Sequence, residues 1–206
     1  MTDRRTRIAV LVSGGGTNLQ ALIDAAAAGK IPDGELALVV SNNPDAYALT
    51  RAEQAGIARQ VCRRQRGEAR EAFEARLQAI LEAHGVDMIV LAGFMAILTK
   101  SFVEKWPERI INVHPSLIPS FCGEGYYGLR VHRAALDYGV KVTGATVHYV
   151  NEIPDGGRII AQKAVEIRED DTPERLQRRV MEQAEWILLP QAAETVAARL
   201  REARRD

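Results

Sequence analysis

The segment that organises this chain reads Ile111-Asn112-Val113-His114-Pro115-Ser116-Leu117-Ile118-Pro119-Ser120-Phe121. Residues 110–113 form a mostly apolar run that predicts a short buried strand, and the two prolines that follow cannot continue a strand inside a sheet. Asn112 and His114 therefore fall at or just beyond the carboxyl end of a strand. Open α/β sheets bind their ligands at that edge, so the segment predicts both a fold class and a site.

Three side chains suit addition to a carbonyl group. Asn112 can donate a hydrogen bond to an oxyanion without changing its own charge, and His114 can exchange a proton near neutral pH. Asp155, in the later Asp155-Gly156-Gly157, can fix the tautomer of a histidine or take up a proton itself. The same residues also fit a buried, hydrogen-bonded histidine, a proline-shaped turn and an ordinary Asp-Gly-Gly turn. Without further context the two interpretations have similar weight.

The N-terminal region predicts an anion site. Residues 8–12 form a continuous apolar run, which is typical of a parallel strand that helices cover on both faces. Residues 13–18 form a glycine-rich loop, and a helix follows at 19–24, so backbone N–H groups and a positive dipole end would face a phosphate. The loop lacks the third glycine of a dinucleotide fingerprint and the Gly-Lys-Ser/Thr of a Walker loop. A turn in which Thr17 or Asn18 simply caps the helix is the alternative.

The remaining apolar periodicities alternate between strand and helix. We expect an α/β fold of one domain over 1–206: an open, mostly parallel, twisted Rossmann-like sheet with helices on both faces. The loop at 151–157 is short enough for its flanking strands to form an antiparallel hairpin near the C-terminal edge. Further strands are predicted at 36–41, 57–62, 87–92, 144–150 and 158–165, and helices at 46–55, 68–84, 129–138 and 176–201, the last with a kink or break at Pro190.

The amino-acid composition limits the classes of partner that the protein is expected to bind. Lysine plus arginine number 27 and aspartate plus glutamate number 27, so no global field attracts nucleic acid or a membrane surface. The two cysteines, Cys62 and Cys122, are too few for a disulfide framework and lack the spacing of a metal site. The N-terminus lacks the apolar core of a signal peptide, and no apolar run has membrane length. We therefore expect a cytoplasmic protein that binds no metal, nucleic acid or membrane.

Three motifs together resemble the signature of the folate-dependent formyltransferases. They are Asn112-x-His114-Pro115-Ser116-Leu117-x-Pro119, Gly144-x-Thr146-Val147-His148 and Asp155-Gly156-Gly157, and the similarity extends over about 8–190. The chain is most similar to the members that formylate glycinamide ribonucleotide. The resemblance implies transfer of the formyl group of 10-formyltetrahydrofolate to that amine, in de novo purine biosynthesis, by a monomer or homodimer. Another formyl-transfer enzyme, a formyltetrahydrofolate deformylase and a non-catalytic nucleotide-binding module are the alternatives.

The resemblance also implies roles for individual residues. Asn112, His114 and Asp155 would be catalytic, with His148 behind them. Glu185 would hold the glycinamide end of the ribonucleotide, although the interval from Val180 to Pro190 is one residue longer than expected, so Glu182 is an alternative. The ribonucleotide phosphate would bind Gly15, Gly16, Thr17 and Asn18, and the folate would bind Arg70, Met95, Ala96, Ile97, Leu98, Asn112 and Val150.

Two features depart from the family pattern. Ala96 stands where the family often has an arginine that contacts the ribonucleotide. Residues 122–128 form a loop longer than in the shortest family versions, and its three glycines and two tyrosines are compatible with a mobile flap or an ordered turn. Cys122, in this loop, lacks an identifiable partner base in the sequence and is expected to be an incidental thiol.

Overall fold

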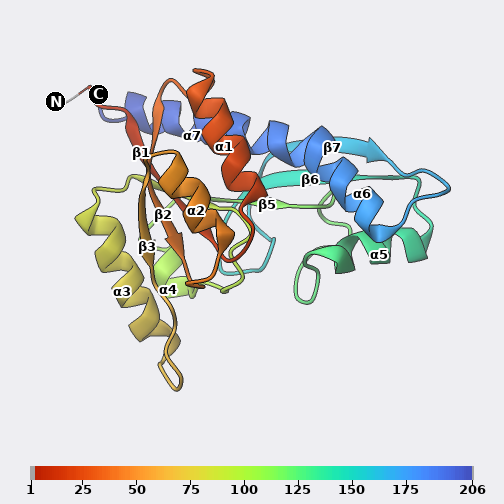
Figure 1. Cartoon of the computed structure of the whole chain (residues 1–206), viewed down its shortest axis with the longest axis horizontal. Coiled ribbons are helices and arrows are strands. Elements are labelled where there is room, and N and C mark those ends of the chain that lie inside the picture. Colours follow the sequence, from red (N-terminus) through yellow and green to blue (C-terminus); the bar gives the residue numbers. More distant parts are fainter. Residues whose placement is uncertain (1–2, 206) are drawn as a thin grey trace.

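The chain folds around one sheet of seven strands, and the computed structural model describes residues 3–205. The strand order is β3-β2-β1-β4-β5-β6-β7. The first five strands of this order are parallel, whereas β6 runs antiparallel to β5 and to β7 (Figure 1). This confirms the predicted fold class and its C-terminal hairpin. The strands are β1 (Thr6–Val12), β2 (Gly34–Ser41), β3 (Ala58–Val61), β4 (Met88–Leu91), β5 (Ile110–His114), β6 (Val142–Tyr149) and β7 (Ile159–Glu166).

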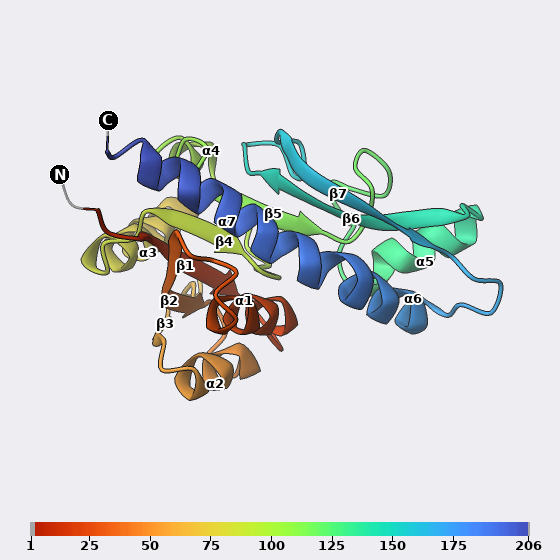
Figure 2. The same ribbon diagram turned by 90° about the horizontal axis from the view of Figure 1, so that it is seen from above.

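The central strands are buried on both faces, as a continuous apolar run requires. Alternate residues of β1 enter two separate cores, with Ile8, Val10 and Val12 on one side and Ala9 and Leu11 on the other. Helices cover both cores (Figure 2). The first core lies under α1 (Thr17–Ala27), α2 (Tyr47–Gln54), α6 (Pro173–Val180) and α7 (Trp186–Glu202), and the second under α3 (Arg70–Ala83) and α4 (Lys100–Val103), while α5 (Leu129–Tyr138) packs against α6.

The C-terminal helical segment differs from its prediction. Pro190 does not break the helix, because α7 continues through it. The irregularity lies earlier, in η1 (Met181–Glu185), a π-helical turn between α6 and α7. Proline lacks the N–H that would bond the carbonyl four residues before it, and here that carbonyl belongs to Trp186, the first residue of α7. The short helix α4 was not predicted, and the bounds of the other elements differ by a few residues.

The sheet contains a topological switch at its centre. The chain leaves β1 toward β2 and β3 and then returns to place β4 on the other side of β1. Loops that follow β1 and β4 therefore diverge at the carboxyl edge and leave a crevice there. One hydrogen bond ties the two loops together, from Met95 N to Ser13 Oγ at 2.9 Å. Within residues 3–205, no helix combines the length and apolar character that crossing a membrane requires.

Candidate active site

His114 is the last residue of β5, and the turn after it is fixed by the neighbouring strand. Thr146 Oγ1, on β6, donates to the carbonyl of Ser116 at 2.7 Å and accepts from Ile118 N at 3.1 Å. Ser116 is fully buried, and its hydroxyl donates to the carbonyl of Ser120. The turn that the prolines impose is therefore anchored to β6, which holds His114 at the carboxyl end of β5.

Asp155 reaches His114 on the turn between β6 and β7. Its backbone has a φ of +55°, a left-handed conformation that aspartate and asparagine tolerate better than most residues. Gly157 is required by close approach, because a Cβ there would lie 1.7 Å from the carbonyl oxygen of Tyr149. Asn151 closes the turn, since its Oδ1 accepts from Ile153 N at 3.0 Å and its Nδ2 donates to the carbonyl of Gly156 at 3.2 Å.

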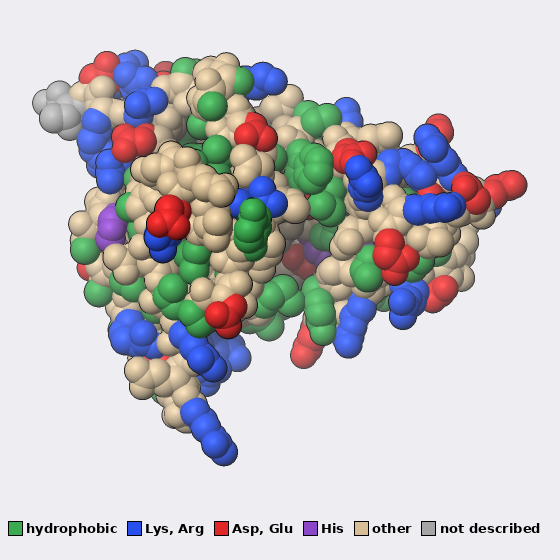
Figure 3. Space-filling model, viewed as in Figure 1, with side chains coloured by type: hydrophobic (Ala, Val, Ile, Leu, Met, Phe, Trp, Pro, Cys, Tyr) green, Lys and Arg blue, Asp and Glu red, His purple; other side chains and the backbone are tan. Residues whose placement is uncertain are grey.

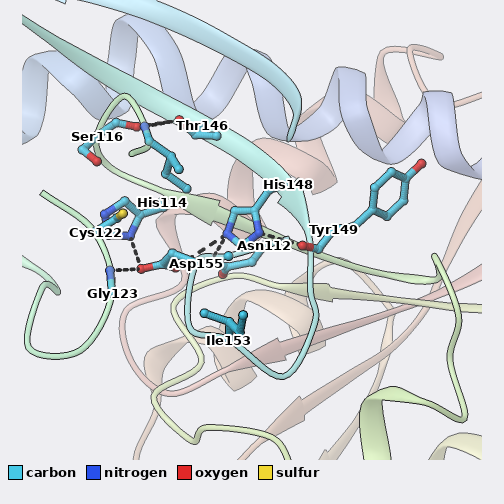
Figure 4. Close-up of polar contacts among 12 residues, drawn as sticks. Asn112, His114, Ser116, Cys122, Gly123, Thr146, His148, Tyr149, Ile153 and Asp155 are labelled. Carbon is cyan, nitrogen blue, oxygen red and sulfur yellow. Dashed lines mark hydrogen bonds and ion pairs between the residues drawn. The ribbon is translucent and has the colours of Figure 1, made fainter. Parts of the chain in front are cut away.

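The imidazole of His114 lies between a carbonyl and the carboxylate of Asp155 (Figure 4). Its Nε2 is 2.9 Å from the carbonyl oxygen of Phe121, which can only accept, so the network places a hydrogen on Nε2. Its Nδ1 is 3.3 Å from Asp155 Oδ2. The backbone N–H of Gly123 donates to the same carboxylate oxygen at 2.9 Å. A proton added to this site would therefore lie between Nδ1 and Oδ2.

His148 connects the other two predicted catalytic residues. Its Nδ1 donates to the carbonyl of Tyr149 at 2.8 Å, which leaves Nε2 as an acceptor for Asn112 Nδ2 at 3.2 Å. The same Nε2 is 3.6 Å from Asp155 Oδ1. A primary amide carries two N–H donors, so Asn112 can give its second one to a ligand. The buried His148 thus orients Asn112 rather than serving as a core residue alone.

Burial and nearby charges set the protonation states of His114 and Asp155. Burial lowers the pKa of His114 even though the charge of Asp155 and the Phe121 carbonyl oppose it. Burial disfavours the ionised form of Asp155, but His148, the charge of His114 and the Gly123 N–H together outweigh it and lower the pKa of Asp155. At neutral pH the site therefore holds a neutral imidazole facing a carboxylate, and the pair can accept one proton.

The loop at 122–128 contains a hydrogen-bonded turn. Tyr126 N donates to the carbonyl of Gly123 at 3.2 Å, and the rings of Tyr126 and Tyr138 lie 6.4 and 6.0 Å from that of Phe121. Burial and the charge of Asp155 raise the pKa of the Cys122 thiol. That thiol therefore stays protonated, which opposes a role as nucleophile.

The glycine-rich loop lies at the start of α1, as predicted. Gly16 has a φ of +73°, and a Cβ there would lie 2.6 Å from that of Ala48, so only glycine fits. Among the described residues, no side chain caps α1, which leaves its first N–H groups for a ligand. Arg51, which the sequence analysis missed, donates from Nε to the carbonyl of Gly15 at 2.8 Å. The loop thus has a cation beside it.

The structure distinguishes the two candidate glutamates. Glu185 is 6% exposed, and its Oε2 accepts from Asn18 Nδ2 at 2.7 Å, whereas Glu182 is exposed and pairs with Arg178. Burial raises the pKa of Glu185 to about 6. The π turn explains the longer spacing from Val180, because it accommodates one extra residue per turn and so keeps Glu185 on the side of the glycine loop.

The predicted folate segment presents an apolar surface beside this loop. Met95 and Ile97 are each 56% exposed, while Leu98 is 7% exposed and packs in the core beneath them. Ala96 and Val150 are half-buried against the same core. Arg70 is exposed at the start of α3, one turn before Glu74, whose carboxylate accepts from Thr99 N at 2.6 Å. Arg70 therefore lies one helical turn from the residue that binds Thr99, which follows Met95 by four residues.

His132 is a neighbour of the site that the sequence analysis missed. It is 1% exposed on α5, and neither ring nitrogen has a partner within residues 3–205. Burial and the charge of His114 lower its pKa to about 4, so it is neutral. The sequence could have indicated it, because His132 falls on the helix face that also carries the buried Val131 and Ala135.

In the space-filling view, histidine and acidic side chains lie at the floor of a central hollow (Figure 3).

Several known proteins are similar to this chain in sequence and in fold. Residues 6–192 match the family model described as formyl transferase. The phosphoribosylglycinamide formyltransferase of Haemophilus influenzae is 43% identical over 177 residues, which are 86% of this chain and 81% of that protein. The crystal structure of glycinamide ribonucleotide transformylase 1 from Symbiobacterium toebii has 43% identity and a TM-score of 0.87, over 94% of this chain and 88% of the other.

A longer relative matches over one part only. The trifunctional purine biosynthetic protein adenosine-3 of Drosophila melanogaster is 45% identical over 189 residues, which are 90% of this chain but 14% of that protein. The extent of the family match and the identity to relatives of similar length agree with the geometry of the site. The chain therefore belongs to the formyl transferase family and, within it, to the phosphoribosylglycinamide formyltransferases.

Proposed function

We propose that this protein transfers the formyl group of 10-formyltetrahydrofolate to the amine of glycinamide ribonucleotide, which yields formylglycinamide ribonucleotide and tetrahydrofolate for purine biosynthesis. The observation that carries the proposal is the convergence of Asn112, His114 and Asp155, with His114 Nδ1 3.3 Å from Asp155 Oδ2, beside a glycine-rich helix start. The names of the relatives agree with this reaction. All these groups lie along one sheet, which supports a single catalytic domain over 1–206.

The ribonucleotide would bind at the start of α1. Its phosphate would accept the free backbone N–H groups of Gly15, Gly16, Thr17 and Asn18, and Arg51 adds a positive charge there. Glu185, bonded to Asn18, would face the polar glycinamide end. Ala96 cannot supply the contact of the arginine that the family often has at its position, so the phosphate depends more on the loop.

The formyl donor is a substrate that fits the other side of the crevice. Its flat pteridine ring needs an apolar surface, and the exposed side chains of Met95 and Ile97 provide one. Leu98 supports that surface from the core rather than covering the ring. Met95 is tied to the glycine-rich loop through Ser13, so the two substrates would meet close to Asn112 and His114.

The side chains then have separate tasks in the transfer. The substrate amine attacks the formyl carbon, a C–N bond forms, and the carbonyl oxygen becomes an oxyanion that receives the free N–H of Asn112. The pair of His114 and Asp155 takes the proton that the attacking nitrogen loses. That proton, held on Nδ1 of His114, is available for the folate nitrogen as its bond to carbon breaks. His114 Nε2 stays bonded to Phe121 and keeps the ring oriented.

A spectroscopic assay of folate release tests the proposal. We expect release from 10-formyltetrahydrofolate only when glycinamide ribonucleotide is present, and loss of release in His114→Ala. His84→Ala is the matched control, because His84 lies at the end of α3, bonded to the carbonyl of Ile80. Release without the ribonucleotide would indicate a deformylase. Binding of the ribonucleotide without turnover of any acceptor would indicate a nucleotide-binding module.

A further inference from the structure

We propose that the groove between α1 and α7 binds the base of a purine nucleoside 5′-monophosphate, whose phosphate occupies the glycine-rich loop in place of that of glycinamide ribonucleotide. The inference rests on the proposed function and adds a means by which purine products restrain it. We call this surface the α1–α7 groove. It has a volume of about 600 Å³, and its walls include Gln20, Ala21 and Asp24 of α1 and Trp186, Ile187 and Gln191 of α7.

The groove begins at the phosphate-binding end of α1. Thr17, the first residue of α1, and Arg51 both line it. The two helices start side by side there, because Glu185, which directly precedes α7, accepts from Asn18 Nδ2 at 2.7 Å. A phosphate bound at the start of α1 therefore lies where the substrate crevice and the α1–α7 groove meet.

The groove has the length and volume of a nucleotide site. It follows α1 from Thr17 to Ala28, which is about 16 Å at about 1.5 Å per residue. Lys30 lines it beyond Ala28, and α1 and α7 pack against each other along it (Figure 2). Its volume falls in the range of about 300 to 1,000 Å³ that is common for small-molecule sites. A base joined through ribose to the phosphate would extend along this length.

Apolar side chains provide a surface for a flat base. Ala21 and Ala25 on α1 are small, which leaves the space open, and Pro190 lines the opposite wall. Ile187 lies beside it on α7 and is 39% exposed, and the half-buried indole of Trp186 lies at the start of the same wall. An indole and an exposed isoleucine across from small residues suit the stacking of an aromatic ring.

Polar side chains at the edge of the groove suit the N–H groups of guanine. Arg51 Nη1 donates to Gln20 Oε1 at 2.8 Å, and Gln20 Nε2 donates to Asp24 Oδ1 at 2.8 Å. These bonds order one wall and leave Asp24 Oδ2 as an acceptor for a ligand. Guanine carries two neighbouring N–H donors on one edge, which a carboxylate can accept, and Gln191 adds an amide that can donate and accept. We therefore expect guanine to be the preferred base.

The test compares dissociation constants for guanosine 5′-monophosphate and for ribose 5-phosphate, which has the phosphate but no base, by isothermal titration calorimetry. In the unaltered protein we expect the nucleotide to bind about tenfold tighter, because the base adds a stacking contact and hydrogen bonds. Ala21→Phe, which fills the groove, and Asp24→Ala, which removes the acceptor, should each lower this ratio and leave the affinity for ribose 5-phosphate unchanged. Ala27→Phe is the matched control, because Ala27 is exposed on α1 outside the groove.

A second measurement reports where the base lies. Trp186 is one of two tryptophans, and the other, Trp106, is buried in the second core, under α3 and α4. Guanosine 5′-monophosphate should quench tryptophan emission and ribose 5-phosphate should not, and Trp186→Phe should abolish the quenching. In the folate-release assay, the nucleotide should raise KM for glycinamide ribonucleotide and leave kcat unchanged, since both ligands use one phosphate site.

The outcomes separate this inference from the proposed function. Equal affinities for the two ligands in the unaltered protein, or a ratio that survives in both groove variants, would overturn the base site and leave the formyl transfer intact. A ratio that falls equally in Ala27→Phe would show that changes to α1, rather than the groove, alter binding, and would also overturn the inference. Binding of neither ligand would contradict the phosphate site of the proposed function as well.

Discussion

At the scale of single residues, the site works through a few side chains whose environments are unusual. Asp155 keeps its charge in a half-buried position because a backbone N–H and two histidines face it. Glu185 is nearly fully buried with one neutral hydrogen-bond partner, and burial raises its pKa. The pKa of one carboxyl group of the crevice is thus lowered and that of the other is raised. The ionised Asp155 suits uptake of a proton, and Glu185 suits positioning of a substrate.

Asp155→Asn should keep the fold and lose activity. Asparagine tolerates the positive φ and can still accept the N–H of Gly123, but it cannot take a proton from His114. We expect kcat to fall by about a hundredfold or more with an unchanged melting temperature. Asp45→Asn, at an exposed aspartate, is the control. A kcat near that of the unaltered protein would remove Asp155 from the mechanism.

Glu185→Gln should stabilise the protein at high pH only. The folded state holds the proton up to pH about 6, whereas the ordinary carboxyl releases it at 4.5. The acid therefore favours folding most below pH 4.5, and this contribution, about 2 kcal/mol, is lost as pH rises through 6. Urea unfolding should show the variant more stable by up to about 2 kcal/mol at pH 8 and equal at pH 4. A difference that does not change with pH would contradict the raised pKa.

At the scale of elements, two local irregularities deliver distant residues to the crevice. The turn between β6 and β7 folds back through Gly157 to bring Asp155 against His114. The π turn η1 rotates the C-terminal helix by the amount that one extra residue needs, and this places Glu185 on Asn18. Both irregularities end next to a residue of the site, which is a common position for such features.

Deleting Gln183 tests the role of the π turn. The exposed Gln183 lies within η1, and its removal should convert the turn to ordinary α-helix while Glu185 stays against Asn18. We expect unchanged stability and a KM for the ribonucleotide like that of the unaltered protein. Deletion of the exposed Thr195 is the control, because it rotates the rest of α7 by about 100° and moves Val196 off the core. Equal destabilisation by both deletions would refute this role.

At the scale of the whole molecule, the site draws on both halves of the sheet. The strands and most helices follow from local apolar patterns, so they could be predicted from the sequence. Local patterns could also place Asn112 and His114 at a strand end. They could not show that Leu98 turns into the core, that Phe121 fixes His114, or that Arg51 lies on the glycine-rich loop, because each depends on contacts between segments far apart in the chain.

The need for contacts between distant segments also explains why the sequence analysis misjudged Pro190 and missed His132. Pro190 predicts a break by its own chemistry, but α7 continues through it, four residues after the helix begins at Trp186. His132 lies on an apolar helix face and reads as a core residue until the fold places it near His114. Sequence patterns therefore define the elements, and packing between them completes the site.

The most direct test of the account follows the formyl carbon itself. The protein would be mixed with 10-formyltetrahydrofolate labelled with ¹³C at the formyl group and with glycinamide ribonucleotide, and the products would be identified by NMR. The account predicts that the label appears on the amine of the ribonucleotide, at a rate that His114→Ala abolishes. Label that appears as free formate, or transfer that survives in His114→Ala, would contradict it.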